Sequence, residues 1–264
     1  MDRRTVRTRA ALRAAILELA AQEDVSELSV VEVARRAGIN RVTFYDHATS
    51  PAALLVAVLA DELDQIRAAL LDPEAVGSRT SASGATPDPL ELVDRVARAV
   101  ASHVERHAAI YERALVRASD DLPAADPHDD ATAVGATLGA PLSTLLADHF
   151  TRTLESFLTG HPWLRPPAAL RPTAPGVAPG ATGHPAPGRP AGEVAGRAEA
   201  SGAVGPAEAR EVRAYARYVA LGSVGALETW LASPAPRDPD FFPRVARAAL
   251  PAWWTTRPQD APTP

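Results

Sequence analysis

The sequence predicts an all-α protein, with a small three-helix head at residues 1–50 and a larger helical region at residues 51–264. Three observations lead to this prediction. Apolar residues recur every three or four positions over long stretches, as they do on one face of an α-helix. Two short segments near the N-terminus each begin with a side chain that caps helices. Proline, glycine and serine gather between the periodic stretches, where they end helices.

A compact pair of helices is encoded in residues 28–47. Ser29, followed three positions later by Glu32, fits a capping box, in which the hydroxyl accepts from a backbone amide of the first turn. Gly38 stands where a helix ends in a left-handed residue, a conformation that costs glycine little. Asn40 then caps a second helix. A short helix, a glycine turn and a polar second helix make up a helix-turn-helix.

The second helix of this pair favours DNA as the target. If Ile39 and Phe44 pack into the core, the polar side chains around them face outward. Arginine can bind O6 and N7 of guanine, asparagine suits adenine, and threonine can contact a thymine methyl. Tyrosine and histidine can donate to phosphate oxygens. A solvated polar face on an ordinary small helix is the alternative. The candidate DNA-contacting residues are Asn40, Arg41, Thr43, Tyr45 and His47.

Residues 9 to about 66 resemble the N-terminal DNA-binding domain of the TetR family of bacterial transcriptional regulators. The run from Thr43 to His47 is similar to the family's signature of an aromatic residue, a tyrosine, any residue and a histidine. The resemblance implies that Ser29 contacts DNA together with the five residues of the second helix. It places the first, second and recognition helices at residues 9–22, 29–37 and 40–47.

Four residues depart from the pattern of the family. Ala48 stands where an aromatic residue is usual, and Pro51 replaces a lysine that commonly binds phosphate. Val42 stands where a small residue is common, and Asp46 adds a negative charge. Ser50 before the proline still permits a capped helix start. These departures predict weaker affinity or a different operator. They leave open a helical protein-interaction module that has lost DNA binding.

The net charge of −5 argues against indiscriminate coating of nucleic acid, so DNA binding must rest on a local basic patch. Arginines crowd the N-terminus and are opposed nearby only by Asp2. As a mobile arm ahead of the first helix, they would reach phosphates or a minor groove, with Arg7 and Arg9 as candidate contacts. A solvated N-terminus without a role is the alternative. The arginines concerned are Arg3, Arg4, Arg7, Arg9 and Arg13.

Composition disfavours several classes of function. The chain has no cysteine, which excludes disulfides, thiolate catalysis and cysteine-held metal. No apolar run approaches the roughly 20 residues that cross a bilayer, and the N-terminus lacks the apolar stretch of a signal peptide. We therefore expect a cytoplasmic protein with no membrane partner. No arrangement of nucleophile and base is recognisable, so we expect no enzyme activity, no catalytic residue and no cofactor.

A metal site is conceivable at two places and expected at neither. His103 and His107 lie one helical turn apart, but Glu105 between them would point away from the face that the histidines share. The acidic segment 120–130 lacks the glycine and the closing glutamate of a calcium loop, which indicates a solvated loop.

Helical periodicity continues through residues 51–264, with the predicted helices at residues 51–70, 89–107, 108–118, 133–158, 206–231 and 241–253. Residues 73–89 have the composition of a loop. Residues 161–206 are rich in proline, glycine and alanine and cannot bury enough apolar surface to offset chain entropy, which predicts a disordered insert. A proline-rich partner-binding tract is the alternative there.

The last two predicted helices resemble the pair that forms the dimer interface of the TetR family. Gly222 and Gly225 would destabilise an isolated helix and fit a place where another helix comes close. The resemblance implies a homodimer whose two readers, about 34–36 Å apart, recognise a palindromic operator. Packing of the same apolar face within one chain is the alternative. The candidate interface residues are Tyr215, Val219, Gly222, Leu227, Trp230, Phe242, Val245 and Ala249.

The sequence thus predicts a ligand-responsive transcriptional regulator, more specifically a repressor that binds double-stranded DNA. As the resemblance implies, an unidentified small-molecule effector would enter the helical body and favour a conformation that cannot bind DNA. A helical enzyme that modifies a small molecule is another alternative, for which the sequence offers no residue set. The candidate effector contacts, each with a core or surface position as its alternative, are His103, His107, Tyr111 and Trp163.

Overall fold

The computed structural model describes residues 3–71, 88–116, 139–160, 206–251 and Trp254, and within these residues it contains helices and no strand. The predicted all-α fold class is therefore confirmed. The helices of the described part are α1 (Arg3–Gln22), α2 (Val30–Ala37), α3 (Arg41–Tyr45), α4 (Pro51–Leu71), α6 (Pro89–Arg106), α7 (Ala108–Tyr111), the π-helix η1 (Glu112–Val116), α9 (Gly139–Gly160), α10 (Pro206–Leu231) and α11 (Phe241–Ala248).

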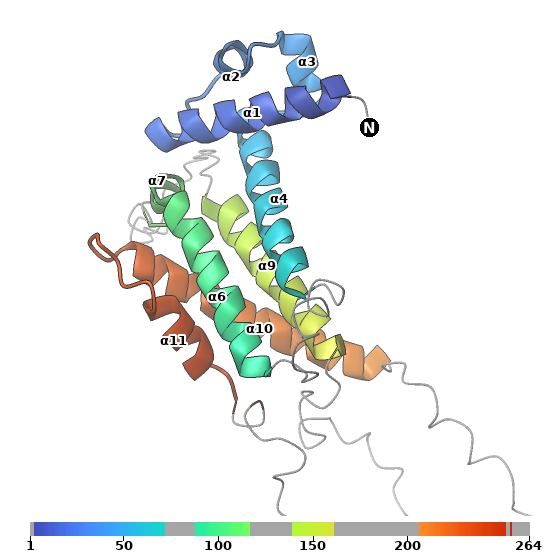
Figure 1. The fold of residues 1–264 in the computed structure, drawn as a ribbon, viewed down its shortest axis with the longest axis vertical. Coiled ribbons are helices and arrows are strands. Elements are labelled where there is room, and N and C mark those ends of the chain that lie inside the picture. The colour runs from blue at the N-terminus through green and yellow to red at the C-terminus, as the bar shows by residue number, and fades with distance from the viewer. Residues whose placement is uncertain (1–2, 72–87, 117–138, 161–205, 252–253, 255–264) are drawn as a thin grey trace, which may run out of the picture.

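Helices α1, α2 and α3 form a small head at one end of the molecule (Figure 1). Helix α1 lies between the body and the other two helices, so α2 and α3 occupy the side of the head that faces away from the body. Phe44 of α3 and Val33 of α2 have no exposed surface and share one apolar cluster with Leu12 and Ile16 of α1. Burial of one such side chain contributes about 1.5–3 kcal/mol. The apolar stripe of α1 therefore holds the two outer helices.

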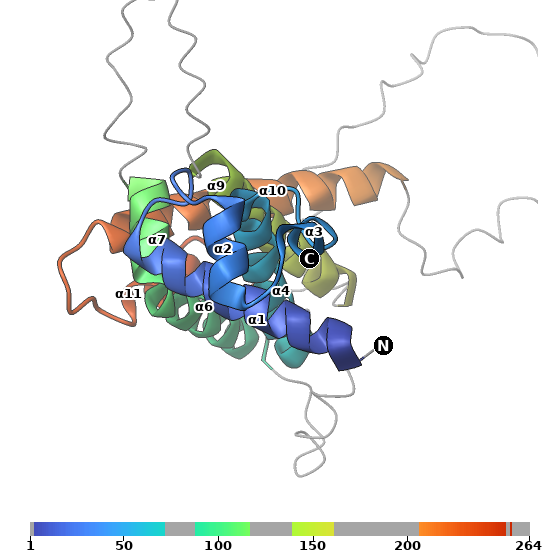
Figure 2. The same cartoon turned by 90° about the horizontal axis from the view of Figure 1, so that it is seen from above.

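The body is a layered bundle that continues from α4. Helices α4, α6 and α9 run side by side, α10 packs across α9, and α11 lies along α6 (Figures 1 and 2). One apolar core runs from the head through Leu55 of α4 to Val100 of α6 and Leu146 of α9. A second cluster, in which Trp254 stacks on Phe157, covers the start of α6. No described helix combines the length and the apolar character that crossing a bilayer requires.

The first helix is longer than predicted. It begins at Arg3, so Arg7 and Arg9 lie on the helix and the expectation of a mobile arginine arm is wrong. Arginine is a good helix former, and neither glycine nor proline interrupts this stretch. The Thr8 hydroxyl donates to the Arg4 carbonyl one turn earlier, at 3.1 Å, as in a continuous helix.

The last helix is shorter than predicted. Helix α11 ends at Ala248, before Pro251, because proline has no amide hydrogen to donate inside a helix. The other predicted helices are confirmed within the described residues to a few positions, with η1 continuing α7 as a wider π-helical turn. The predicted loop 73–89, the acidic segment 120–130 and the insert 161–206 lie almost wholly outside the described residues.

One arginine of the body holds the C-terminal end of α1. The Arg113 guanidinium of η1 donates to three carbonyls there, at 2.6, 2.9 and 2.7 Å, from Ala20, Ala21 and Glu23. Carbonyls at the end of a helix lack helical amide partners, and a cation there also complements the helix dipole. The head is therefore attached to η1 as well as to α4.

Candidate nucleic-acid interface

The turn between α2 and α3 has the geometry that the sequence predicts. Ser29 caps α2, since its hydroxyl accepts from the Glu32 amide at 3.2 Å. Gly38 ends the helix at φ 67° and ψ 32°, a left-handed conformation that costs most other residues about 1–2 kcal/mol. The Ile39 amide then donates to the Ala34 carbonyl at 3.0 Å. This bond satisfies the end of α2 while the chain turns into α3.

Helix α3 is held by one cap and one buried ring. The Asn40 side-chain oxygen accepts from the Thr43 amide at 2.8 Å. Phe44 has no exposed surface, and Ile39 packs against the same core. The two apolar residues therefore face inward as predicted, and the remaining side chains of α3 are directed outward or along the edge of the helix.

The outward face of α3 presents a cation and an aromatic ring. Arg41 is exposed and forms no ion pair with any residue in the described part of the chain. Tyr45 is 54 % exposed. Asn40 is exposed too, while Thr43 and His47 are half-buried beside them. Together these five side chains can donate to, and accept from, base edges and phosphate oxygens.

Further polar side chains lie on the two neighbouring helices. Ser29 is exposed at the start of α2, and Arg7 and Arg9 are exposed on α1. The charge of Arg36 on α2 is instead matched by an ion pair with Glu18 of α1. Because Arg7 and Arg9 belong to a helix, their reach is limited to the length of one side chain.

The residues that depart from the family pattern are accommodated without disrupting the fold. Pro51 is buried in the first turn of α4, and the Ser50 hydroxyl accepts from the amide three residues on at 3.1 Å, so this helix start is capped as predicted. Ala48 packs against the core of the head. Val42 is 73 % exposed and Asp46 is also exposed, so both belong to the outward surface around α3.

A buried polar cluster joins α1, α4, α6 and α7 where the head meets the body. Glu62 of α4 places its Oε2 atom 2.9 Å from Nε2 of His107 and 3.1 Å from Nδ1 of His103. The Oε1 atom of Glu62 accepts from Arg13 of α1 at 2.6 Å. On the other side, His103 Nε2 lies 3.0 Å from the Tyr111 hydroxyl. We call these five residues the Glu62 cluster.

Burial sets the protonation of the Glu62 cluster. Burial, helped by the neighbouring His107, lowers the pKa of His103 to about 4, so this ring is neutral at pH 7. Burial opposes ionisation of Glu62, but the hydrogen bond from His107 and the charge of Arg13 lower the pKa of this carboxyl overall. Burial also raises the pKa of Tyr111. At neutral pH the cluster therefore holds a carboxylate, an arginine cation and a neutral His103.

Three of the four predicted effector contacts meet in this cluster, but they do not line an open cavity. His103 and Tyr111 have no exposed surface, and Trp163 lies outside the described residues. Sequence reasoning missed Glu62, although one signal was present. Glu62 stands among the inward-facing leucines of residues 51–70, where an ionised side chain is costly unless it is paired.

Three of the predicted dimer residues belong to the core of their own chain. Leu227, Trp230 and Phe242 are at most 3 % exposed, so a partner cannot reach them and their assignment to an interface is corrected. The Trp230 indole donates to the Asp238 carbonyl at 2.9 Å, and the Phe242 ring lies 6.0 Å from that of Phe150. The physical reason is that α10 packs one face on α9, and α11 packs its apolar face on α6. Of the other candidates, the exposed ones are Gly222 and Ala249 and the half-buried ones are Tyr215, Val219 and Val245.

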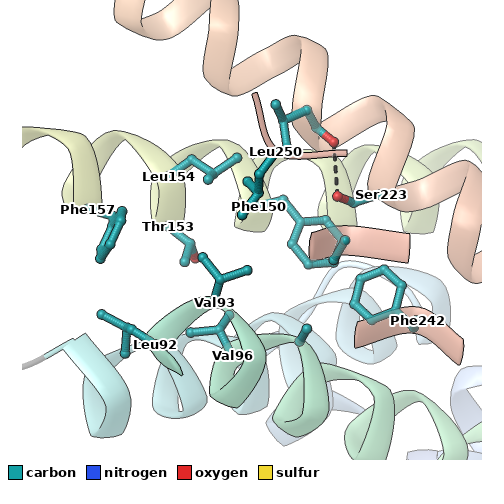
Figure 3. Close-up of a pocket in the computed structure, with 13 residues that line it drawn as sticks. Leu92, Val93, Val96, Phe150, Thr153, Leu154, Phe157, Ser223, Phe242 and Leu250 are labelled. Carbon is teal, nitrogen blue, oxygen red and sulfur yellow. Dashed lines mark hydrogen bonds between the residues drawn. The ribbon is translucent and has the colours of Figure 1, made fainter. Parts of the chain in front are cut away.

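An apolar pocket lies between α6, α9, α10 and α11 (Figure 3). It encloses about 70 Å³ of unfilled space. Two hydroxyls reach it. Ser223 donates to the Val219 carbonyl at 2.9 Å, whereas the Thr153 hydroxyl has no hydrogen-bond partner within the described residues. His103, His107 and Tyr111 do not line this pocket, whose walls include Leu92, Val93, Val96, Phe150, Leu154, Phe157, Phe242 and Leu250.

Comparison with known proteins gives matches to the head and the start of α4. Residues 12–58, from within α1 to within α4, match the family of bacterial regulatory proteins described as the tetR family. The chain is also 43 % identical over 56 residues to an uncharacterised HTH-type transcriptional regulator, YxbF, of Bacillus subtilis (strain 168). That similarity covers 21 % of this chain and 15 % of the relative's length. Residues 12–58 are thus similar to the helix-turn-helix domain of the tetR family of bacterial regulatory proteins.

Proposed function

We propose that the protein is a DNA-binding transcriptional regulator, and more specifically a repressor that a small-molecule effector releases from its operator. The outward face of α3 is the observation that carries this proposal. In a helix-turn-helix, the N-terminal residues of the second helix reach base edges in the major groove. Arg41 opens α3 and Asn40 caps it, so these two residues read bases. Tyr45, His47 and Ser29 bind phosphates, as do Arg7 and Arg9 on α1.

Replacing Arg41 by alanine should weaken binding to the preferred DNA sequence about 5- to 150-fold, the equivalent of the 1–3 kcal/mol that one bidentate arginine–guanine pair contributes. The measurement is a fluorescence-anisotropy titration at several salt concentrations, on a fragment selected from genomic DNA. The matched control is Arg152→Ala, which removes an exposed arginine of α9 in the body and should leave affinity unchanged. If binding is indifferent both to Arg41 and to salt, the protein-interaction module is the better interpretation.

The homodimer that a palindromic operator requires forms through the outward face of α10. On this face Tyr218 is 78 % and Leu221 54 % exposed. Gly222 and Gly225 lie on it too, with nothing within 4 Å of the place where a Cβ would stand. None of the helices that the structure describes covers these glycines, and their small size leaves room for the close approach of a second α10. A two-fold axis at this face would present two α3 helices to adjacent turns of DNA.

Replacing Leu221 by glutamate should convert the dimer to monomers, because the two-fold axis brings the introduced charge into the interface from both chains. Sedimentation velocity over a range of protein concentrations measures the change. Val31→Glu is the control, since Val31 is a similarly exposed apolar residue on the head (52 % exposed) and the substitution should leave the dimer intact. A variant that still sediments as a dimer would exclude this face of α10.

The effector site in this proposal is the apolar pocket of Figure 3. Its lining suits a largely apolar molecule with one polar group that pairs with the Thr153 hydroxyl. The 70 Å³ of unfilled space is less than the roughly 300–1,000 Å³ of typical ligand pockets, so an effector must widen the gap between α6 and α10. Helix α6 leads through α7 to η1, whose Arg113 holds the end of α1. An effector that prefers the widened pocket thereby shifts the population of head positions.

A further inference from the structure

We propose that Glu62, His103 and His107 form a binding site for a divalent transition-metal ion of the Zn²⁺ type. One ligand atom from each residue lies within 4.8 Å of the other two. Two imidazole nitrogens, from His103 of α6 and from His107 directly after this helix, face a single carboxylate oxygen of α4, at 3.1 and 2.9 Å. Ligands about 2.1 Å from a tetrahedral ion lie about 3.4 Å apart. These two distances need to change by a few tenths of an ångström to admit the ion, and the two imidazole nitrogens, which lie within 4.8 Å of each other, must come to the same separation.

The buried ring of His103 offers one nitrogen to the ion. Its Nδ1 atom is fully buried and faces Glu62 Oε2 at 3.1 Å. A neutral imidazole carries its proton on only one nitrogen, so Nδ1 can bind a metal ion when the proton lies on Nε2. The opposite nitrogen, Nε2, is occupied by the Tyr111 hydroxyl at 3.0 Å. Such an outer hydrogen bond fixes the ring orientation of a histidine that binds metal.

The contacts of Glu62 also fix the orientation of this ligand. Its Oε1 atom is held by Arg13 at 2.6 Å, and Oε2 has, besides the two histidines, the exposed Arg106 guanidinium as a further ion-pair partner, at 3.9 Å, so an ion at Oε2 would displace that side chain toward solvent. His107 is 14 % exposed, so an ion can enter from that side and a water molecule can complete its coordination. Two imidazoles and one carboxylate, without sulfur, suit Zn²⁺ and neighbouring divalent ions rather than Cu⁺.

As expected from the sequence, the carboxylate that stands between the two histidines along the chain is not the one that meets them. Glu105, between the two histidines, forms an ion pair with Arg237 at 3.2 Å and takes no part in the cluster. The carboxylate comes instead from α4, the helix that leads out of the head. A bound ion therefore joins α4 to α6, and Arg13 extends the connection to α1. From this link, which rests on the proposed function, we infer that the ion also changes affinity for DNA.

The test uses the full chain without a histidine tag, stripped with EDTA and titrated with Zn²⁺ against a chromophoric chelator. We expect one ion per chain. Removing a side chain that hydrogen-bonds to a metal ligand weakens metal binding about 10- to 100-fold, so Tyr111→Phe should lower the affinity for Zn²⁺ by a factor in that range. Glu62→Gln and His107→Gln, which remove ligands, should each lower it more than about 100-fold. The matched control is Glu105→Gln, on the same helix, which should bind as the unaltered protein does. Co²⁺ should give the visible absorption of a tetrahedral site in the unaltered protein and in Glu105→Gln, but not in Glu62→Gln or His107→Gln.

Two further measurements separate the possible failures. Zn²⁺ should raise the Tm of the unaltered protein but not that of His107→Gln, a half-buried position where the variant is expected to fold. The metal site is excluded if Zn²⁺ does not bind in a ratio of one ion per chain, or if Glu62→Gln and Glu105→Gln bind Zn²⁺ equally well. In either case the Glu62 cluster is a buried ion pair only. If the ion binds as expected but operator affinity does not change with Zn²⁺, the metal site stands and its link to DNA binding is wrong.

Discussion

Replacing Phe44 by alanine should lower the free energy of unfolding by about 3–5 kcal/mol, the range measured for truncation of large buried aromatic residues. Phe44 has no exposed surface and joins α3 to the apolar stripe of α1. Its ring also supports Tyr45, whose centroid lies 5.7 Å away in an edge-to-face arrangement. Because whole domains are stable by only about 5–15 kcal/mol, this loss should unfold α3 in part of the population. Urea denaturation followed by circular dichroism measures it.

The neighbouring residue Val42 supplies the control for Phe44. Val42 is 73 % exposed, so Val42→Ala should change stability by no more than about 0.5 kcal/mol. DNA binding by Phe44→Ala should fall in proportion to the folded fraction and recover at lower temperature. A Phe44→Ala protein as stable as the Val42 variant would contradict the inward packing of α3.

Acid should destabilise the protein through His149 of α9. This residue is 1 % exposed, and neither ring nitrogen has a hydrogen-bond partner within the described residues. Burial lowers the pKa of His149 to about 4; the charges of Arg67 and Arg152 add to this effect and Asp64 opposes it. The unfolded chain, with an ordinary histidine pKa of about 6.5, binds a proton first as the pH falls. Stability is therefore retained above pH 6.5 and lost between pH 6.5 and 4.

His149→Leu should remove this part of the acid sensitivity. A pKa difference of this size corresponds to about 3 kcal/mol between pH 7 and pH 4. At pH 7 the leucine variant should be at least as stable as the unaltered protein, since it buries no unpaired ring nitrogen. Urea denaturation of both proteins at a series of pH values gives the comparison. Parallel stability curves from pH 7 to pH 4 would show that His149 is protonated equally in the folded and unfolded chains.

The head could be predicted from the sequence because its signals are local. The caps at Ser29 and Asn40 act over three residues, and the turn at Gly38 is decided by a single backbone angle. The arginines before residue 9 were harder to place. Arginine is compatible with both a helix and a solvated arm, and only contacts with the rest of the fold favour one over the other.

The helices of the body could be predicted from the sequence, but the side chains that meet between them could not. Glu62 meets His103 and His107 across two helices, and no spacing in the sequence indicates which carboxylate will face a given histidine. Three of the eight candidate interface residues, Leu227, Trp230 and Phe242, are buried within the chain for a related reason. Helix α10 has apolar residues on two faces, and periodicity does not tell which face packs within the chain. Leu227 lies on the inner face and Leu221 on the outer one.

The attachment of α1 restricts how the head can move. Arg13 is fixed to Glu62 of α4, and the carbonyls at the end of the same helix are fixed to Arg113. These two anchors lie roughly 10–15 Å apart along α1, at 1.5 Å per residue. A rigid element fixed at two points can rotate only about the line that joins them, which here is close to its own long axis. The low-energy motion of the head is therefore a roll about α1, which carries α3 sideways along an arc instead of tilting it.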